Sequence, residues 1–442
     1  MKKFIIAMNV SLMLILSFTA CVKDTATIAQ TSIEAVAKYL STTTDGAVKE
    51  NPIQLAIKID LQNMLASDSG WKKLLGAINT AGKYVALDLS ACTMPGTEFD
   101  PDPSFADGKK FITSLVLPDT VTSIAKIEET NPNSIFQHFV NLSSIPIGKT
   151  LSSIGDGAFW NCGLTSVIIP NNITYIGDGA FSGNKLTSVT IPNSVTYIGS
   201  FAFSGNQLTG VIIPNSVTSI GSGAFVNNQL TSITIPDSLT SISAHTFAHN
   251  HMSSVTIPNS VTSIGTQAFD FNQLSSITIP DSVIVIEDGN LADFTEGFTG
   301  AFSNNQITSI NFPIDLSVIG AGAFFNNQLT SVVIPDSITS IRAGAFMNNQ
   351  LTSISFPDSI TVIEDFAFFN NHLTSVTIPN SVTKIGNYAF TDNQLISVTI
   401  PGNILDIGYG AFSFFEDIYR DGGRQAGTYT RPDTNSRTWT RQ

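Results

Sequence analysis

The sequence has little positive charge, few charged residues of either sign and almost no cysteine. Lys and Arg total 21 against 34 Asp and Glu, so the formal net charge is −13. DNA and RNA phosphates are bound by clustered Lys and Arg, so this balance argues against a nucleic-acid partner. Three cysteines in 442 residues exclude a disulfide scaffold. Charged residues make up only 12%, but the 42% of hydrophobic residues exclude wholesale disorder.

No run at the N-terminus is long enough to be a plain membrane span. The apolar stretch from Phe4 to Phe18 has 15 residues, fewer than the ~20 that cross a bilayer. It follows Met1-Lys2-Lys3 and ends at Thr19-Ala20-Cys21, which is typical of a secretory signal. The triplet before Cys21 resembles a bacterial lipoprotein signal, although Phe18 stands where an aliphatic residue is usual. The resemblance implies that Cys21 is lipidated and becomes the mature N-terminus.

We therefore expect residues 1–20 to be a lipoprotein signal peptide and residues 21–30 a polar tether. The protein would be exported and anchored by lipid in the bacterial envelope, on the outer-membrane surface. The membrane would be a partner through this lipid anchor only.

A repeat of 22 residues organises most of the remaining chain. Proline marks it at these positions: Pro170, Pro192, Pro214, Pro236, Pro258 and Pro280, then Pro313, Pro335, Pro357, Pro379 and Pro401. The step from Pro280 to Pro313 is 33 residues, so one unit carries 11 extra residues near 287–297. A period of 20–29 residues with regularly placed apolar positions indicates leucine-rich repeats.

Each unit predicts one coil of a solenoid. Val189 and Ile191 alternate with polar residues, as in a short half-buried strand, and Pro192 ends that strand. Val195 and Ile198 point inward from a second extended piece. A single coil cannot bury its apolar edge, so the coils must stack and form one continuous core.

Two residue columns run through the repeats. A phenylalanine recurs at these positions: Phe159, Phe181, Phe203, Phe225, Phe247, Phe269, Phe302, Phe324, Phe346, Phe368, Phe390 and Phe412. An asparagine follows three residues later in ten of these units, namely Asn184, Asn206, Asn228, Asn250, Asn272, Asn305, Asn327, Asn349, Asn371 and Asn393. We expect this buried structural ladder to bond backbone groups of its own coil and the next one. Cys162 holds the same place in an earlier coil.

The unit Leu-x-x-Val-x-Ile-Pro-x-Ser-Val-Thr-x-Ile-Gly-x-x-Ala-Phe-x-x-Asn resembles the BspA-like, treponemal class of bacterial leucine-rich repeats. The resemblance covers residues 151–412, with a degenerate unit around 115–118. That class usually has Cys where this chain has Asn, and its units are one residue longer. The resemblance implies a leucine-rich-repeat solenoid of short parallel β-strands. It also implies adhesion, with extracellular-matrix proteins such as fibronectin or fibrinogen as partners.

Both ends of the solenoid are expected to carry caps. Thr31 and Glu34 have capping-box spacing before a helical pattern, and strand and helix patterns alternate as far as residue 95. We therefore predict a small α/β cap over 31–95 and irregular first coils over 96–150. Ile418-Tyr419 and Gly427-Thr428-Tyr429 flank Asp421-Gly422, which predicts a β-hairpin in a C-terminal β cap over 413–442.

The C-terminal cap is also locally basic. Its arginines are Arg420, Arg424, Arg431, Arg437 and Arg441. They are interpreted as solvated charge, with a basic docking patch as the alternative.

Candidate metal sites are weak. His245, His249 and His251 lie within seven residues, which suggests zinc, but His251 occupies a surface column that holds Gln229 and Gln273 in neighbouring units. The four carboxylates of 287–296 suggest calcium but lack EF-hand spacing. We expect a surface loop there, with a partner-contacting loop as the alternative.

Catalytic and cofactor signatures are weaker still. Cys92 and Cys162 could pair, but both fit buried repeat positions several coils apart. The glycines of 177–183 have the wrong spacing for a dinucleotide loop. No serine lies in a nucleophile elbow and no acid–base pair interrupts the repeat, so we predict no enzyme and no cofactor.

The exposed strand positions form the candidate binding face. Its residues are Ser188, Thr190, Ser232, Thr234, Ser254, Thr256, Ser276 and Thr278. One interpretation is that these residues only reflect the β-propensity of a solvated face. The other is that they offer hydrogen bonds to a protein or glycan. Rows of threonine can also bind ice, but irregular members such as Ile212 argue against that function here. The leading hypothesis is a surface-displayed protein that binds a host or neighbouring-cell macromolecule. The alternative is a periplasmic or structural lipoprotein without a host ligand.

Overall fold

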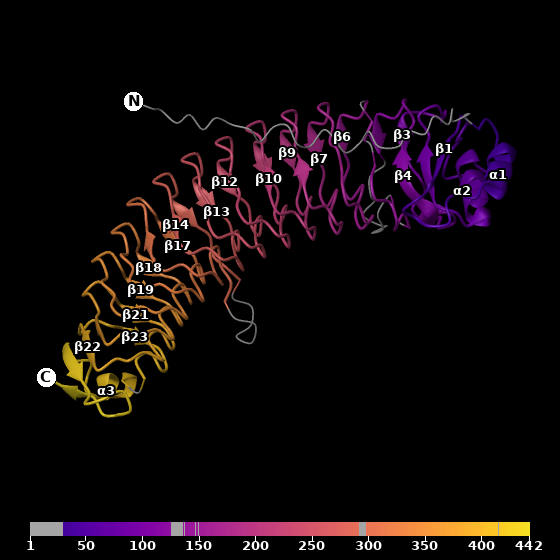
Figure 1. The fold of residues 1–442 in the computed structure, drawn as a ribbon. Helices are drawn as coiled ribbons and strands as arrows, with labels where there is room; N and C mark the ends of the chain where they lie inside the picture. The colour runs from indigo at the N-terminus through magenta and orange to yellow at the C-terminus, as the bar shows by residue number, and fades with distance from the viewer. Residues whose placement is uncertain are drawn as a thin grey trace, which may run out of the picture.

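The computed structural model describes residues 30–124, 136, 138–145, 147, 148, 150–290, 298–413 and 415–442. These residues form a curved row of stacked coils, with an α/β unit at the N-terminal end and α3 with two strands at the C-terminal end (Figure 1). The predicted signal sequence, Cys21 and all of the tether except Gln30 lie outside the described residues. In the described part of the chain, no helix has the length and apolar character that a membrane span requires.

The N-terminal cap packs two helices on a parallel sheet. Helices α1 (Ile33–Thr42) and α2 (Gly70–Ala81) accompany strands β1 (Ile53–Ala56), β2 (Val85–Asp88) and β4 (Ile112–Val116), in the sheet order β1-β2-β4. Each helix begins at a serine whose Oγ accepts a backbone hydrogen bond, Ser32 from Ala35 and Ser69 from Lys72. The prediction that Thr31 caps the first helix is therefore wrong by one residue.

The cap sheet continues into the first coils. Its third strand, β4, lies within the segment 96–150 that the sequence assigns to irregular coils. The short strands β3 (Glu98–Phe99) and β5 (Ser123–Ile124) pair in parallel, and the 3₁₀ helix η1 (Lys109–Phe111) precedes β4. The open edge of the cap sheet is thereby used to start the solenoid rather than left exposed.

Each regular coil contributes to two columns of short parallel strands. The first column, which carries the candidate binding face, contains β8 (Val189–Thr190), β10 (Val211–Ile212), β14 (Ile277–Thr278), β16 (Ile310–Asn311), β20 (Ser375–Thr377) and β22 (Ser397–Ile400). The second contains β6 (Ser153–Ile154), β7 (Tyr175–Ile176), β9 (Tyr197–Ile198), β11 (Ser219–Ile220), β12 (Ser241–Ile242), β13 (Ser263–Ile264), β15 (Val285–Ile286), β17 (Val318–Ile319), β18 (Ser340–Ile341), β19 (Val362–Ile363), β21 (Lys384–Ile385) and β23 (Asp406–Ile407). Equivalent repeat positions pair, as Val189 does with Val211.

The phenylalanine column is the axis of the core. From Phe159 to Phe412 the rings of successive coils stack with centroids 4.9–5.9 Å apart. The structure extends this stack toward the N-terminus through Phe136 and Phe99. The irregular first coils therefore share the core of the regular ones, although their sequence does not keep the 22-residue period.

The C-terminal cap closes the last coil with an antiparallel addition. Strand β24 (Gly427–Thr430) pairs with β22 and with β25 (Thr440–Arg441). The predicted hairpin was placed wrongly, because Ile418 and Tyr419 lie in helix α3 (Glu416–Asp421). Asp421-Gly422 ends that helix instead of forming a strand turn. The antiparallel pair is β24 with β25, and Trp439 is buried just before β25.

Candidate functional site

The candidate binding face lies on the first strand column. Along each coil the strand residues alternate between buried and exposed, so Val189 and Ile277 enter the core while Thr190 and Thr278 face outward. Thr234 continues this arrangement through single parallel bridges to Ile212 on one side and Thr256 on the other. The structure thus places the eight predicted serines and threonines in two exposed rows on one face.

Part of this face is hollowed. Three shallow depressions of about 430, 520 and 490 Å³ follow one another from Val189 to Asp281. The first and second share Thr234, and the second and third share Thr256. We call this row of depressions the Ser/Thr trough; of the eight predicted residues, Ser232, Thr234, Thr256 and Thr278 line it. Its exposed apolar member is Ile212, whose side chain is 80% exposed.

The asparagine ladder holds the coils that carry the trough. In each repeat unit the side-chain oxygen accepts from the backbone N–H of the first residue of that unit; Asn272, for example, accepts from Met252 at 3.0 Å. Its Nδ2 donates to the carbonyls of Phe247 and Phe269 at 3.0 and 3.1 Å. The ladder therefore joins each coil to the one before it, whereas the sequence analysis named the next coil. Asn393, in the last coil of the ladder, is half-buried rather than buried.

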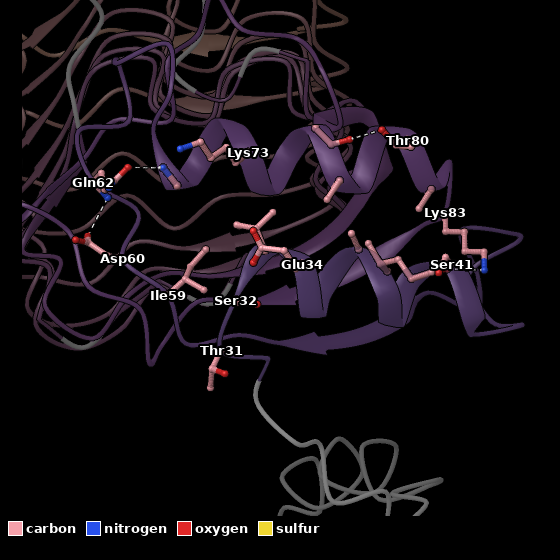
Figure 2. Close-up of a pocket in the computed structure, with 17 residues that line it drawn as sticks. Thr31, Ser32, Glu34, Ser41, Ile59, Asp60, Gln62, Lys73, Thr80 and Lys83 are labelled. Atoms are coloured by element: carbon pink, nitrogen blue, oxygen red, sulfur yellow. Dashed lines mark hydrogen bonds between the residues drawn. The ribbon is translucent and has the colours of Figure 1, made fainter.

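A cavity lies between α1 and α2 of the N-terminal cap. It measures about 940 Å³, and Figure 2 shows Glu34 projecting from α1 into the space between the two helices. Its polar groups already serve the fold: Lys83 Nζ donates to the carbonyl of Leu40 at 2.8 Å, and Gln62 accepts from the Gly70 N–H at 3.0 Å. Bonds from its own backbone N–H and from Ser32 lower the pKa of Glu34. This groove is explained by helix packing and capping.

The histidines are not gathered into a metal centre. Among the described residues, no cluster of three or more His, Cys, Asp or Glu side chains could hold a metal ion. His249 instead stacks on Phe271 with ring centroids 4.7 Å apart. Burial lowers the pKa of His245, against an opposing effect of Asp270. Cys92 and Cys162 are both buried and are not joined in a disulfide, and burial raises the pKa of Cys92.

The described ends of the 11-residue insertion are fixed to the solenoid. Asn290 and Thr299 form an antiparallel bridge that closes the neck of the insertion. Asp288 accepts from the Ala321 N–H at 2.9 Å and pairs with Arg342 at 3.1 Å. Of the predicted calcium carboxylates, Glu287 and Asp288 lie in the described part of the chain, and Asp293 and Glu296 lie outside it.

The C-terminal arginines are partly committed to the cap. Arg431 is buried over the ring of Trp439, 4.8 Å from its centroid, and donates to the carbonyls of Leu395 and Ser436. Arg441 donates to the carbonyl of Ala426. These contacts favour the interpretation of the tail as a cap and weaken the alternative of a basic docking patch.

Sequence reasoning missed a buried charged cluster where the cap meets the first coils. Lys109 is fully buried, with Nζ 2.5 Å from the carbonyl oxygen of Asp102 and 5.3 Å from the ring centroid of Phe139. Burial lowers the pKa of Lys109 to about 8 and raises the pKa of Asp100. Burial would raise the pKa of Asp102, but hydrogen bonds from Lys72 and Ser104 bring it below its usual value. No repeat signal marks this cluster, because it lies outside the 22-residue register.

Sequence reasoning also missed a second column at the outer corner of each coil. Phe201, Phe366 and Tyr388 occupy it with positive φ, and glycines such as Gly223 and Gly410 occupy it in other coils. A Cβ on Gly223 would lie 2.5 Å from the ring of Phe201, and one on Gly410 would lie 2.8 Å from the ring of Tyr388. The glycines therefore make room for an aromatic ring of the preceding coil. Aligning the repeats at this position would have revealed the column.

The comparisons with known proteins agree with the repeat architecture. The sequence model described as BspA type leucine rich repeat region (6 copies) matches residues 101–229, 176–295 and 298–418. A leucine-rich repeat protein from Bacteroides ovatus is 25% identical over 70% of this chain and 79% of its own, with a TM-score of 0.55.

Two further solved structures are similar to this chain. One from Eubacterium ventriosum is 23% identical over 66% of this chain and 86% of its own, with a TM-score of 0.46. A leucine rich cell surface protein from Faecalibacterium prausnitzii is 26% identical over 72% and 83%, with a TM-score of 0.44. No curated protein matches the chain.

Proposed function

We propose, from the premise that this chain belongs to the family of BspA-type leucine-rich-repeat proteins, that it is a surface-displayed binding protein. Leucine-rich-repeat families are in general binding proteins rather than enzymes, and solenoids offer extended surfaces to large partners. The ligand would be a protein or glycan of the host matrix or of a neighbouring cell. The protein would reach the outer-membrane surface through its signal sequence and stay there through lipid on Cys21.

The observation that carries this proposal is the Ser/Thr trough. It offers repeated hydroxyl groups across neighbouring coils, and no Lys, Arg or Glu belongs to its lining; Asp237 and Asp281 lie at its edge. Each hydroxyl is both a donor and an acceptor. An extended partner that crosses several coils would make many weak contacts at once, and such contacts add up to a useful affinity.

The test of the binding face compares two triple lysine variants in cells that display the protein. One variant carries Thr234→Lys, Thr256→Lys and Thr278→Lys in the trough. The control carries Thr218→Lys, Thr240→Lys and Thr262→Lys, which are exposed threonines beside the second strand column. Adhesion to immobilised fibronectin and fibrinogen should fall only in the first variant. Equal losses in both would mean that added charge, and not the trough, affects adhesion.

Surface display is tested separately. Protease treatment of intact cells should cleave the protein if it is exposed, whereas a periplasmic structural lipoprotein would survive. Cys21→Ala should release the chain from the membrane fraction or leave it unprocessed. Palmitate label in that variant equal to the wild type would refute lipidation at Cys21.

A further inference from the structure

Six aromatic side chains form a continuous row of ring contacts at the outer corner of the C-terminal coils, and five of them are at least partly exposed. We call it the aromatic ridge; its residues are Phe298, Phe325, Phe366, Phe369, Tyr388 and Tyr409. Phe298 lies 6.2 Å from Phe325 and 5.8 Å from Phe366, measured between ring centroids. Phe366 lies 5.7 Å from Phe369 and 5.2 Å from Tyr388. Tyr388 meets Tyr409 edge to face at 5.5 Å.

The ridge is separate from the phenylalanine core. The core column runs through Phe324, Phe346, Phe368, Phe390 and Phe412, which are buried and stack on one another. In contrast, Tyr409 is 71% exposed, Phe325, Phe366, Phe369 and Tyr388 are half-buried, and Phe298 is the buried member of the ridge. Contiguous aromatic side chains that stay partly exposed are typical of interaction surfaces.

The backbone at the ridge takes a left-handed conformation that belongs to this position of the repeat. Phe366 and Tyr388 have φ values of 58° and 53°. Gly322, Gly344 and Gly410 hold this conformation in neighbouring coils. Phe201, His245 and Gln267 hold it at the same position in coils outside the ridge, so the conformation sets where the side chain starts and does not by itself mark a site.

The charge around the ridge is acidic. The corner segments that carry it, with the described start of the insertion, contain the carboxylates Glu287, Asp288, Glu364, Asp365 and Asp392. Arg342 is the cation of these described segments, and it is already paired with Asp288. Asp365 lies beside the ridge, because its carboxylate accepts a hydrogen bond from the backbone N–H of Asn387. The side-chain oxygen of Asn387 accepts in turn from the Tyr409 N–H at 2.9 Å.

We propose that the aromatic ridge binds an arginine-bearing segment of a partner protein. A guanidinium group stacks on an aromatic face and also pairs with a carboxylate, whereas a lysine ammonium is more strongly hydrated and does not stack. Tyr388 and Tyr409 supply the rings and Asp365 supplies the carboxylate. This site lies in other coils and on another face than the Ser/Thr trough, so it goes beyond the function proposed above and does not depend on it.

The experiment measures binding of three labelled peptides to the full chain by fluorescence anisotropy. The probes alternate glycine with arginine around one central leucine, and matched peptides carry lysine or glutamate in place of arginine. The arginine peptide should bind at least about threefold more tightly than the lysine peptide, and the glutamate peptide should not bind. Raising the salt concentration should weaken the arginine complex, because the carboxylates around the ridge are exposed or half-buried and dissolved ions screen them.

Variants locate the site and identify the interaction. Tyr409→Ala with Tyr388→Ala should weaken the arginine complex by about fivefold or more. Tyr409→Phe should keep the preference for arginine, and Tyr409→Leu should lose it, because leucine has bulk but no π face. Leu405→Ala is the matched control, since Leu405 is also 71% exposed but lies beside the second strand column; it should bind as the wild type does.

Two results would overturn the proposal. One is equal affinity for the arginine and lysine peptides, which would reduce the binding to nonspecific attraction by an acidic protein. The other is wild-type affinity in the double tyrosine variant with its melting temperature unchanged. Because Tyr409 is exposed, the Tyr409→Leu variant is expected to fold, and its affinity decides the question even if Tyr388→Ala destabilises the chain.

Discussion

At the scale of single residues, the fold depends on a few polar side chains that complete the backbone hydrogen bonding of the turns. Each ladder asparagine uses both ends of its amide: the oxygen accepts from the first residue of its own unit, and the nitrogen donates to carbonyls of its own unit and of the preceding one. A buried carbonyl or N–H without a partner is costly, so these side chains are required by the turns they serve. The exposed side chains next to the asparagines are not needed for this hydrogen bonding.

A substitution in the ladder tests this assignment. Asn272→Ala removes the acceptor of the Met252 N–H and a donor to two carbonyls, and it should lower the free energy of unfolding by about 1–3 kcal/mol. Gln273→Ala changes an exposed side chain and should stay within about 0.5 kcal/mol of the wild type. Denaturant melts of both variants give the comparison. Equal losses would mean that the register of the ladder is wrong.

Lys109 supplies a residue-scale prediction about pH. Its pKa is about 8 in the folded chain and ~10.4 when unfolded. Between these values the unfolded chain holds a proton that the folded chain has released, so this residue makes stability rise with pH across that window. The rise should be about 3 kcal/mol. This rise should be absent in the Lys109→Met variant. It should be present in the Lys110→Met variant, because the side chain of Lys110 is exposed.

The measurement is the free energy of unfolding as a function of pH, taken as the difference between each variant and the wild type. Taking differences removes the contribution of other groups, such as Tyr419, whose pKa burial raises. If the Lys109→Met difference stayed constant from pH 8 to 10.4, the buried ammonium would not be the cause.

At the scale of elements, the insertion is an integrated part of one coil. Asp270 is fully buried against the segment that follows the insertion. It accepts from the Ser303 hydroxyl at 2.6 Å and from the Asn304 amide at 3.0 Å. Ser303 in turn accepts from the Gly300 N–H at 2.8 Å. Regular coils hold Ser204, Val226 or Ala248 where Asp270 stands. The aspartate is therefore a local adaptation to the longer unit.

This adaptation predicts a loss of stability that is specific to one coil. Asp270→Ala should cost about 3 kcal/mol, because it removes several hydrogen bonds to a buried carboxylate and leaves the donors unpaired. Ser204→Ala, at the equivalent position of a regular coil, should cost less than about 1 kcal/mol. Denaturant melts give both numbers. Similar small losses in the two variants would show that the insertion does not depend on Asp270.

At the scale of the whole molecule, the regular coils could be predicted from the sequence and the departures from regularity could not. The 22-residue period places Phe203 and Asn206 in the same environment in every coil, so one unit explains them all. Lys109 and Asp270 escape this reasoning because each occurs once. The partners of Lys109 lie outside the 22-residue period, and no other coil has an aspartate at the position of Asp270. The hairpin error has the same origin, since Ile418-Tyr419 has an apolar pattern that fits a strand or a short helix equally well.

The Ser/Thr trough and the aromatic ridge differ in how much of each could be predicted from the sequence. Thr234 and Thr256 are exposed, as strand alternation predicts. The depressions that these threonines line depend on how the coils stack, which the sequence pattern does not give. Phe298 joins the ridge across the insertion, so no fixed spacing links it to Tyr388.

The ends of a solenoid are its points of weakness, because the last coil has no neighbour to cover it. Here β24 covers the edge of β22 through four paired residues, and Phe415 extends the core stack, with its ring 5.3 Å from Phe412. Trp439 and Tyr429 enclose Phe415, with ring centroids at 5.5 and 5.0 Å. Without this cap, an unpaired strand edge and the face of Phe412 would meet water.

Removal of residues 415–442 should therefore make the chain associate with itself and lower its melting temperature. An open β-edge beside an apolar core recruits other chains by edge-to-edge pairing. Light scattering and thermal unfolding of the truncated chain measure the two effects. Arg441→Ala is the matched control, because it changes an exposed residue of the outermost strand and leaves β24 in place. A truncated chain that stayed monomeric with an unchanged melting temperature would mean that the last repeat coil closes the solenoid by itself.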